Sequence, residues 1–202
     1  PPPPPPPPPL FFFTQTRPSP ILSGLVGSEM CIRDRYTFSS LKEKVSKFAW
    51  ALRDQGVNKG DRVIIYMPMI PEAIVSMLAC SRIGAIHSVV FGGFASNELA
   101  VRIDDAKPKA IIAGSCGIEP TSIIPYKPLL DKAIEQANHK PNFCVIFQRD
   151  ELQAPLVSNR DYDWYEFQKS SSECTCIPVF GNDPLYILYT YEMFYLARRW
   201  AK

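Results

Sequence analysis

The chain has 202 residues, of which 46% are hydrophobic and 21% are charged, and its formal net charge is +2. This balance is that of a globular protein long enough to bury a core, and it gives no reason to expect nucleic acid or an anionic membrane surface as a partner. The sequence has no apolar run near the ~20 residues that a membrane helix needs, and six cysteines in this length are not a disulfide scaffold, so a reducing compartment is expected.

Residues 1–35 differ in composition from everything that follows. Pro1–Pro9 is a homopolymer that favours extended polyproline II. Ser28–Arg35 resembles a peptide that arises when adapter sequence is translated at the edge of an assembled transcript. We therefore expect residues 1–35 to be a disordered, non-native leader and exclude them from fold reasoning. A native disordered leader and a transit peptide are the alternatives.

From Tyr36 the sequence becomes periodic. Apolar side chains recur at helical spacing through residues 41–52, which predicts an amphipathic helix. The pair Ser40 and Glu43 fits a capping box at its start, and Gly56 is expected to end it.

The next stretch predicts a strand, a helix and a second strand. Val63–Tyr66 is apolar and β-branched, as a strand covered on both faces should be. Pro71 suits the first position of a helix, where no backbone N–H is needed, and Gly84 ends that helix before an apolar strand at 85–90. A right-handed crossover then makes the two strands parallel. The loop Phe91–Phe94 follows a carboxyl end, where open parallel sheets bind ligands.

The rest of the chain continues this alternation. Ser96 is expected to cap a helix, and a long polar surface excursion with a short helix near 164–169 is expected at 148–183. The other expected elements are a helix at 97–107, a strand at 109–113, a loop at 114–125, a helix at 125–138 and strands at 143–147 and 185–189. Five strands separated by helices predict an α/β fold with a doubly wound, mostly parallel sheet.

Long phrases at 66–72, 79–94 and 183–190 resemble short-chain acyl-CoA synthetases, the acetyl- and propionyl-CoA synthetase branch of the adenylate-forming, AMP-dependent synthetase/ligase enzymes. The resemblance covers 36–190 and implies a partial AMP-dependent synthetase/ligase domain, the first subdomain of that fold. It implies a parent ligase that converts acetate or propionate, ATP and CoA into acyl-CoA, AMP and pyrophosphate. ATP and Mg²⁺ are the implied cofactors, CoA is the co-substrate, and the mitochondrial matrix or cytoplasm is the implied compartment.

The resemblance implies that the glycine pair in the loop after the second strand faces CoA. Without side chains, Gly92 and Gly93 would let the backbone approach the pantetheine arm. The alternative is a tight strand-to-helix turn that needs a positive φ.

A second implied CoA contact lies at Glu119, Pro120, Thr121 and Ser122. In relatives the matching positions contact the nucleotide end of CoA, often through an arginine, which suits a phosphate. Here Thr121-Ser122 stands where near relatives tend to have Gly-Arg, so hydroxyls replace a charge. The alternative is a plain surface loop.

The last residues, 191–202, leave the resemblance. In relatives, the strand ending at Thr190 continues into a Ser/Thr/Gly-rich loop that holds the ATP phosphates, whereas 191–202 has no glycine. We expect 191–202 to be a non-native tail and the chain to be inactive alone, with no catalytic or metal residue. The alternative function is a non-catalytic, Rossmann-like CoA-binding module. His87 is expected to be a satisfied core histidine.

Overall fold

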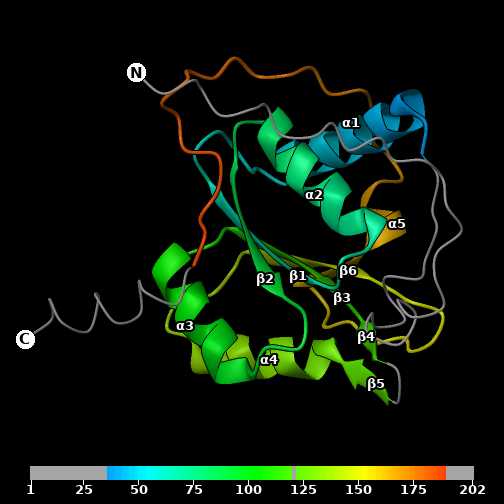
Figure 1. Cartoon of the computed structure of the whole chain (residues 1–202), viewed down its shortest axis with the longest axis vertical. Coiled ribbons are helices and arrows are strands. Elements are labelled where there is room, and N and C mark those ends of the chain that lie inside the picture. The colour runs from blue at the N-terminus through cyan, green and yellow to red at the C-terminus, as the bar shows by residue number, and fades with distance from the viewer. Residues whose placement is uncertain (1–35, 120–121, 190–202) are drawn as a thin grey trace, which may run out of the picture.

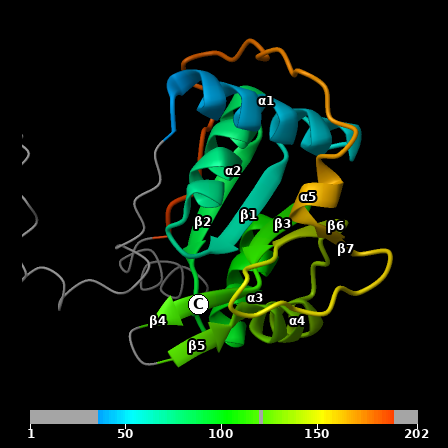
Figure 2. The same cartoon turned by 90° about the vertical axis from the view of Figure 1, so that its right-hand side faces the viewer.

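The computed structural model describes residues 36–119 and 122–189 as a parallel β-sheet with helices on both faces (Figures 1 and 2). This confirms the α/β fold with a doubly wound, mostly parallel sheet. The elements are α1 (Phe38–Asp54), β1 (Arg62–Met67), α2 (Pro71–Arg82), β2 (Ile86–Phe91), α3 (Ser96–Ala106), β3 (Ala110–Gly114), β4 (Cys116–Glu119), β5 (Ser122–Pro125), α4 (Tyr126–Gln136), β6 (Phe143–Phe147), β7 (Asp161–Asp163) and α5 (Trp164–Phe167).

The strand order explains where the loops meet. The main sheet runs β2-β1-β3-β6-β7, and each neighbouring pair is parallel. The chain leaves β1 for β2 on one side and then returns past β1 to β3 on the other, so the order reverses between β1 and β3. In open α/β sheets, the carboxyl ends of the strands beside such a reversal form the ligand-binding edge.

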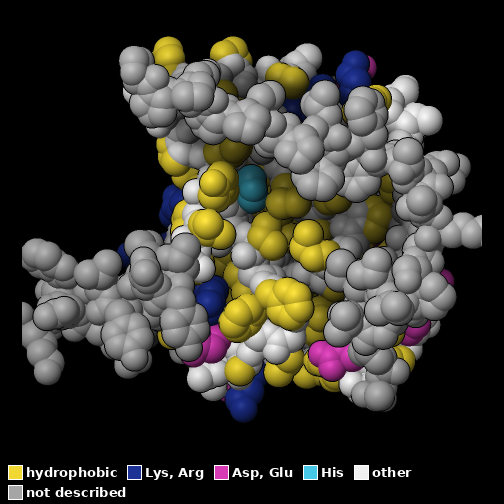
Figure 3. All heavy atoms as spheres, in the orientation of Figure 1, with side chains coloured by type: hydrophobic (Ala, Val, Ile, Leu, Met, Phe, Trp, Pro, Cys, Tyr) yellow, Lys and Arg dark blue, Asp and Glu magenta, His cyan; other side chains and the backbone are white. Residues whose placement is uncertain are grey.

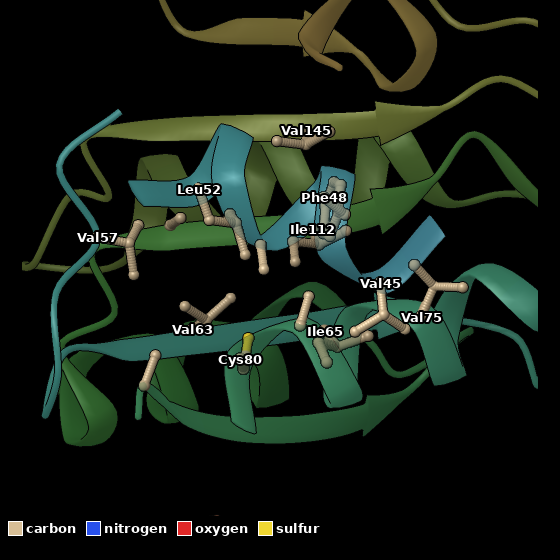
Figure 4. Close-up of a cluster of buried hydrophobic side chains, with 14 of the residues drawn as sticks. Val45, Phe48, Leu52, Val57, Val63, Ile65, Val75, Cys80, Ile112 and Val145 are labelled. Atoms are coloured by element: carbon tan, nitrogen blue, oxygen red, sulfur yellow. The ribbon is translucent and has the colours of Figure 1, made fainter. Parts of the chain in front are cut away.

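Each face of the sheet has its own hydrophobic core. Helices α1 and α2 cover one face, where Phe48 lies among the buried side chains of Leu52 and Ile112 (Figure 4). Phe48 is fully buried and stacks on Trp164 with ring centroids 4.2 Å apart. Helices α3 and α4 cover the other face and bury Leu99, Ile103 and Leu130. Burying such side chains contributes about 1.5–3 kcal/mol each, so the two cores fix the sheet from both sides.

Two helix starts differ from the predicted caps. Helix α1 begins at Phe38, and its N-cap is Thr37, whose Oγ1 accepts a hydrogen bond from the backbone N–H of Ser40 at 3.1 Å. Ser40 therefore lies inside the helix, and the predicted capping box is wrong. Ser96 is likewise the first residue of α3 rather than its cap, which is Ala95. The predicted breaks at Gly56 and Gly84 are confirmed by their positive φ of 83° and 67°.

Three other segments also depart from prediction. The expected loop at 114–125 contains the antiparallel hairpin of β4 and β5, and the expected excursion at 148–183 contributes β7 as well as α5. The expected strand at 185–189 makes one parallel bridge, between Tyr186 and His87. Its apolar residues lie at the open edge of β2, where no further strand among the described residues continues the pairing.

The described cysteines, which are Cys80, Cys116, Cys144, Cys174 and Cys176, are all free thiols. Within the described ranges, no helix combines the length and apolar character needed to cross a membrane.

A cluster of four charges joins α4 to β7, and in it Lys127 and Asp161 are buried whereas Arg160 and Asp131 are partly exposed. Lys127 is 1% exposed, and its Nζ lies 2.6 Å from Asp131 Oδ1 and 2.9 Å from Asp161 Oδ2. Arg160 contacts both carboxylates as well. Burial raises the pKa of Asp161, but hydrogen bonds from Arg160 and Lys127 outweigh it, so the net pKa is lowered. The stabilisation is therefore present above the pKa of the unfolded chain and is lost as the pH falls through the folded pKa.

The variant Lys127→Met should lower the free energy of unfolding by about 3 kcal/mol at pH 7, because it removes one of the two cations that contact the buried carboxylate of Asp161 and leaves it with Arg160 and the backbone N–H of Val157. Urea unfolding measures this, and the loss should shrink in acid as Asp161 becomes protonated. The exposed pair of Lys47 and Glu43 provides the control, because Lys47→Met should leave stability nearly unchanged. Equal losses in both variants would contradict the assignment.

Candidate functional site

The candidate site lies at the carboxyl edge of the sheet. The glycine loop (Phe91–Phe94) follows β2, Pro68 follows β1, and Ser115 follows β3. At the reversal between β1 and β3, a Cβ added to Gly114 would lie 3.4 Å from Pro68 Cδ, so the two strand ends pack closely. Parallel pairing therefore brings these loops, which are far apart in the sequence, to one edge.

The two glycines of the glycine loop have different structural roles. Gly92 is buried, and a Cβ added to it would lie 2.6 Å from Cζ of Tyr126. Gly93 is exposed and has a φ of +98°, which an L side chain rarely adopts, and a Cβ there would meet nothing closer than 3.9 Å. The positive-φ turn is confirmed at Gly93, whereas at Gly92 the missing side chain makes room for an aromatic ring.

The ring of Tyr126 joins the glycine loop to the hairpin. Tyr126 is 5% exposed and begins α4, with its backbone N–H donating to the carbonyl of Ser115 at 3.0 Å. A Cβ added to Gly117 in β4 would overlap Oη of Tyr126. One ring thus fills the space left by two glycines, Gly92 and Gly117, that belong to different elements.

A second tyrosine holds the far end of the glycine loop. The hydroxyl of Tyr66, at the end of β1, donates to the carbonyl of Phe94 at 3.0 Å, and its ring lies 5.4 Å from that of Tyr126. Burial raises the pKa of Tyr66 to about 12. The phenol therefore stays a neutral donor at physiological pH and fixes the loop backbone.

The second group of predicted site residues lies at the free end of the hairpin. Glu119 and Ser122 are paired across β4 and β5, and both are exposed. Pro120 and Thr121 lie outside the described residues. The hairpin approaches the glycine loop at Gly117, through Tyr126, so the structure brings together the base of the hairpin and Gly92 rather than its tip.

Residues 26–190 match the profile of the family described as AMP-binding enzyme. The chain belongs to this family. It is 52% identical over 155 residues to acyl-CoA synthetase short-chain family member 3, mitochondrial, of Rattus norvegicus, covering 76% of this chain and 23% of that protein. It is 46% identical over 168 residues to the propionate–CoA ligase of Escherichia coli, covering 82% and 27%.

The fold also matches that of a solved structure. The acetoacetyl-CoA synthetase of Streptomyces lividans superposes with a TM-score of 0.71 at 22% identity, over 80% of this chain and 24% of that one. The α/β architecture is therefore shared. The chain spans about a quarter of the length of the curated relatives it matches.

Sequence reasoning missed the two tyrosines and Gly117 of this AMP-binding enzyme segment. Tyr66 is the last aromatic of an apolar strand and reads as core, and Tyr126 begins a helix after a proline. The available signal was Gly117, because a glycine in a strand often marks a close approach of another group.

His87 in β2 is buried, as predicted, but it is not satisfied. Its Nδ1 has no hydrogen-bond partner among the described residues, and burial lowers its pKa. In Figure 3, hydrophobic side chains gather over β2 around a hollow that contains a histidine. Val89 and Phe91, which follow on the same face of the strand, are exposed.

The described residues do not offer an obvious metal site. Within 36–119 and 122–189, no group of three or more His, Cys, Asp or Glu side chains could hold a metal ion. Three hollows lie along α1, and none of them is lined by the glycine loop or the hairpin. None of these residues is assigned to Mg²⁺.

Gly92→Ala should destabilise the protein by about 1–3 kcal/mol, because the added methyl overpacks against the buried ring of Tyr126. Gly93→Ala should cost about 1–2 kcal/mol for a different reason, the positive φ. To separate overpacking from backbone strain, Gly92→Ala and Gly93→Ala are each combined with Tyr126→Ala, and the free energies of unfolding are measured.

In the Tyr126→Ala background, the cost of Gly92→Ala should largely disappear, while the cost of Gly93→Ala should persist. Additive losses for Gly92→Ala and Tyr126→Ala would show that the ring does not fill the space above Gly92.

Proposed function

We propose that this chain is the first α/β segment of an ATP-dependent ligase that joins a short carboxylic acid, acetate or propionate, to CoA. Membership of the AMP-binding enzyme family supports this, as do relatives named for short-chain acyl-CoA synthesis and propionate–CoA ligation. The observation that carries the proposal is the fixed glycine loop at the ligand-binding edge of the sheet.

In this proposal the glycine loop is one wall of the channel for the pantetheine arm. Gly93 is where the pantetheine arm can come close to the backbone. This residue is exposed, and the nearest atoms to a Cβ added there would be 3.9 Å away. Gly92 acts indirectly, since the space above it is already taken by Tyr126. Tyr66 and Tyr126 hold the loop backbone in place, so that a narrow, flexible arm meets a preformed surface.

The hairpin tip would then meet the nucleotide end of CoA. Glu119 and Ser122 are exposed there on either side of Pro120 and Thr121. The hydroxyls of Thr121 and Ser122 can donate hydrogen bonds to a phosphate, but they bring no charge, so the contact is weaker than an arginine would make.

The acid-activating half of the reaction belongs to other parts of the ligase. When bound, ATP and Mg²⁺ would supply the phosphoryl chemistry that forms an acyl-adenylate and pyrophosphate. We propose that 36–190 is native domain sequence and that the chain alone has no ligase activity. The proposed compartment is the mitochondrial matrix or cytoplasm.

Titration calorimetry with CoA tests the role of the hairpin. We expect the chain to bind CoA weakly, with a dissociation constant on the order of millimolar. The double variant Thr121→Gly/Ser122→Arg should bind roughly ten- to a hundredfold more tightly, because a charge-assisted hydrogen bond contributes about 1.5–3 kcal/mol. The matched control, Thr121→Gly/Ser122→Gln, has a long side chain without charge and should show little gain.

Equal affinities for the arginine and glutamine variants would remove the hairpin tip from the CoA site. Micromolar binding by the unchanged chain would instead favour the alternative, a CoA-binding module that works without the rest of a ligase.

A further inference from the structure

One buried arginine lies between the glycine loop and the end of the described chain. Arg102 in α3 is 8% exposed. Its guanidinium carbon lies 4.7 Å from the centroid of the Phe94 ring and 5.5 Å from that of Tyr189. Phe94 closes the glycine loop, and Tyr189 ends the segment that runs beside β2. A cation thus contacts two rings from segments far apart in the sequence.

Side chains on one face of α3 bind both Arg102 and Tyr189. The NH1 group of Arg102 donates to the carbonyl of Glu98 at 2.8 Å and lies 3.4 Å from its carboxylate. The hydroxyl of Tyr189 donates to Oδ2 of Asp105 at 2.7 Å. Positions 98, 102 and 105 follow helical spacing, so all three side chains project from one face of the helix.

Because both contact Arg102, the position of the glycine loop and the position of residues 185–189 depend on each other. Cation–ring attraction strengthens when the cation is withdrawn from water, and Arg102 is almost fully buried. Phe94 is tied in turn to Tyr66 through its carbonyl. A displacement of either ring changes the best position of the guanidinium, and therefore the contact with the other ring.

We propose that Arg102 is a positioning residue that couples the glycine loop to the segment 185–189, so that occupancy of the loop is transmitted to Tyr189. The proposal rests on the proposed function, in which the loop faces CoA. By the family resemblance, Tyr189 lies one residue before Thr190, after which the ATP-phosphate loop begins in relatives. Arg102 would then fix the position of the glycine loop relative to the segment that leads into the phosphate loop. By linkage, the binding of CoA and the binding of ATP in the whole ligase would each change the affinity for the other.

Amide hydrogen exchange on the whole chain tests the coupling without any ligand. Tyr189→Leu removes one ring and should speed exchange of the Phe94 amide, which donates to the carbonyl of Phe91, by about threefold to tenfold. The matched control is Tyr186→Leu, which removes an exposed ring of the same segment that lies 6.0 Å from His87 instead. It should leave the Phe94 amide unchanged.

Substitution of Arg102 tests whether the coupling between the glycine loop and residues 185–189 passes through this side chain. Arg102→Met should speed exchange of both the Phe94 amide and the Ile187 amide, which donates to His87. Arg102→Lys retains a cation and should recover part of the protection. In the Arg102→Met background, Tyr189→Leu should have no further effect on Phe94. The coupling is overturned if Tyr189→Leu changes exchange only within 185–189, or if its effect on Phe94 persists without Arg102.

Adding CoA separates this inference from the proposed function. If CoA slows exchange in the glycine loop, the Ile187 amide should also slow in the native chain but not in Arg102→Met. Loop protection without any change at Ile187 in the native chain would overturn the transmission to Tyr189. If saturating CoA protects no loop amide in the native chain, the CoA-facing role fails, whereas the ligand-free comparisons still decide whether Arg102 couples the segments.

Discussion

The structure at the carboxyl edge of the sheet depends on one packing contact, which we call the tyrosine interlock: the ring of Tyr126 fills the space left by Gly92 and Gly117. Gly92 belongs to the loop after β2 and Gly117 to strand β4, and neither position has room for a side chain while the ring is present. Because the ring is buried against Tyr66, the glycine loop cannot shift without disturbing β1, α4 and the hairpin together. The loop is therefore held both by packing against Tyr126 and by the hydrogen bond from Tyr66 to the carbonyl of Phe94, which suits a surface that receives a flexible ligand.

The rest of the fold supports this interlock. Tyr126 is the first residue of α4, and the next residue, Lys127, anchors the same turn to β7 through the buried carboxylate of Asp161. The cores on both faces of the sheet fix the strand ends from which the loops leave. On the opposite side of the glycine loop, Arg102 extends the same network to Tyr189. The chain thus connects its buried charges, its aromatic rings and its candidate ligand surface through short, direct contacts.

The sequence predicted the features that depend on local chemistry. The β-branched run Val63–Tyr66, the proline at 71 and the glycine at 84 defined the first crossover, because each residue acts within its own element. The interlock of Tyr126 with two distant glycines could not be predicted, since it depends on strand order rather than on spacing. The hairpin was missed because its strands are only four residues long, and residues 185–189 were overpredicted because an apolar run does not show whether a neighbouring strand is present to pair with it.

The central claim is that this segment forms the CoA-facing wall of a short-chain acid–CoA ligase. The most direct test replaces the aligned stretch of the E. coli propionate–CoA ligase with residues 36–190 of this chain and measures propionyl-CoA formation from propionate, ATP, Mg²⁺ and CoA. The account predicts an active chimera with a raised KM for CoA, which Thr121→Gly/Ser122→Arg lowers while kcat changes little. A folded chimera that binds ATP yet forms no propionyl-CoA, with or without the Gly-Arg substitution, would contradict it.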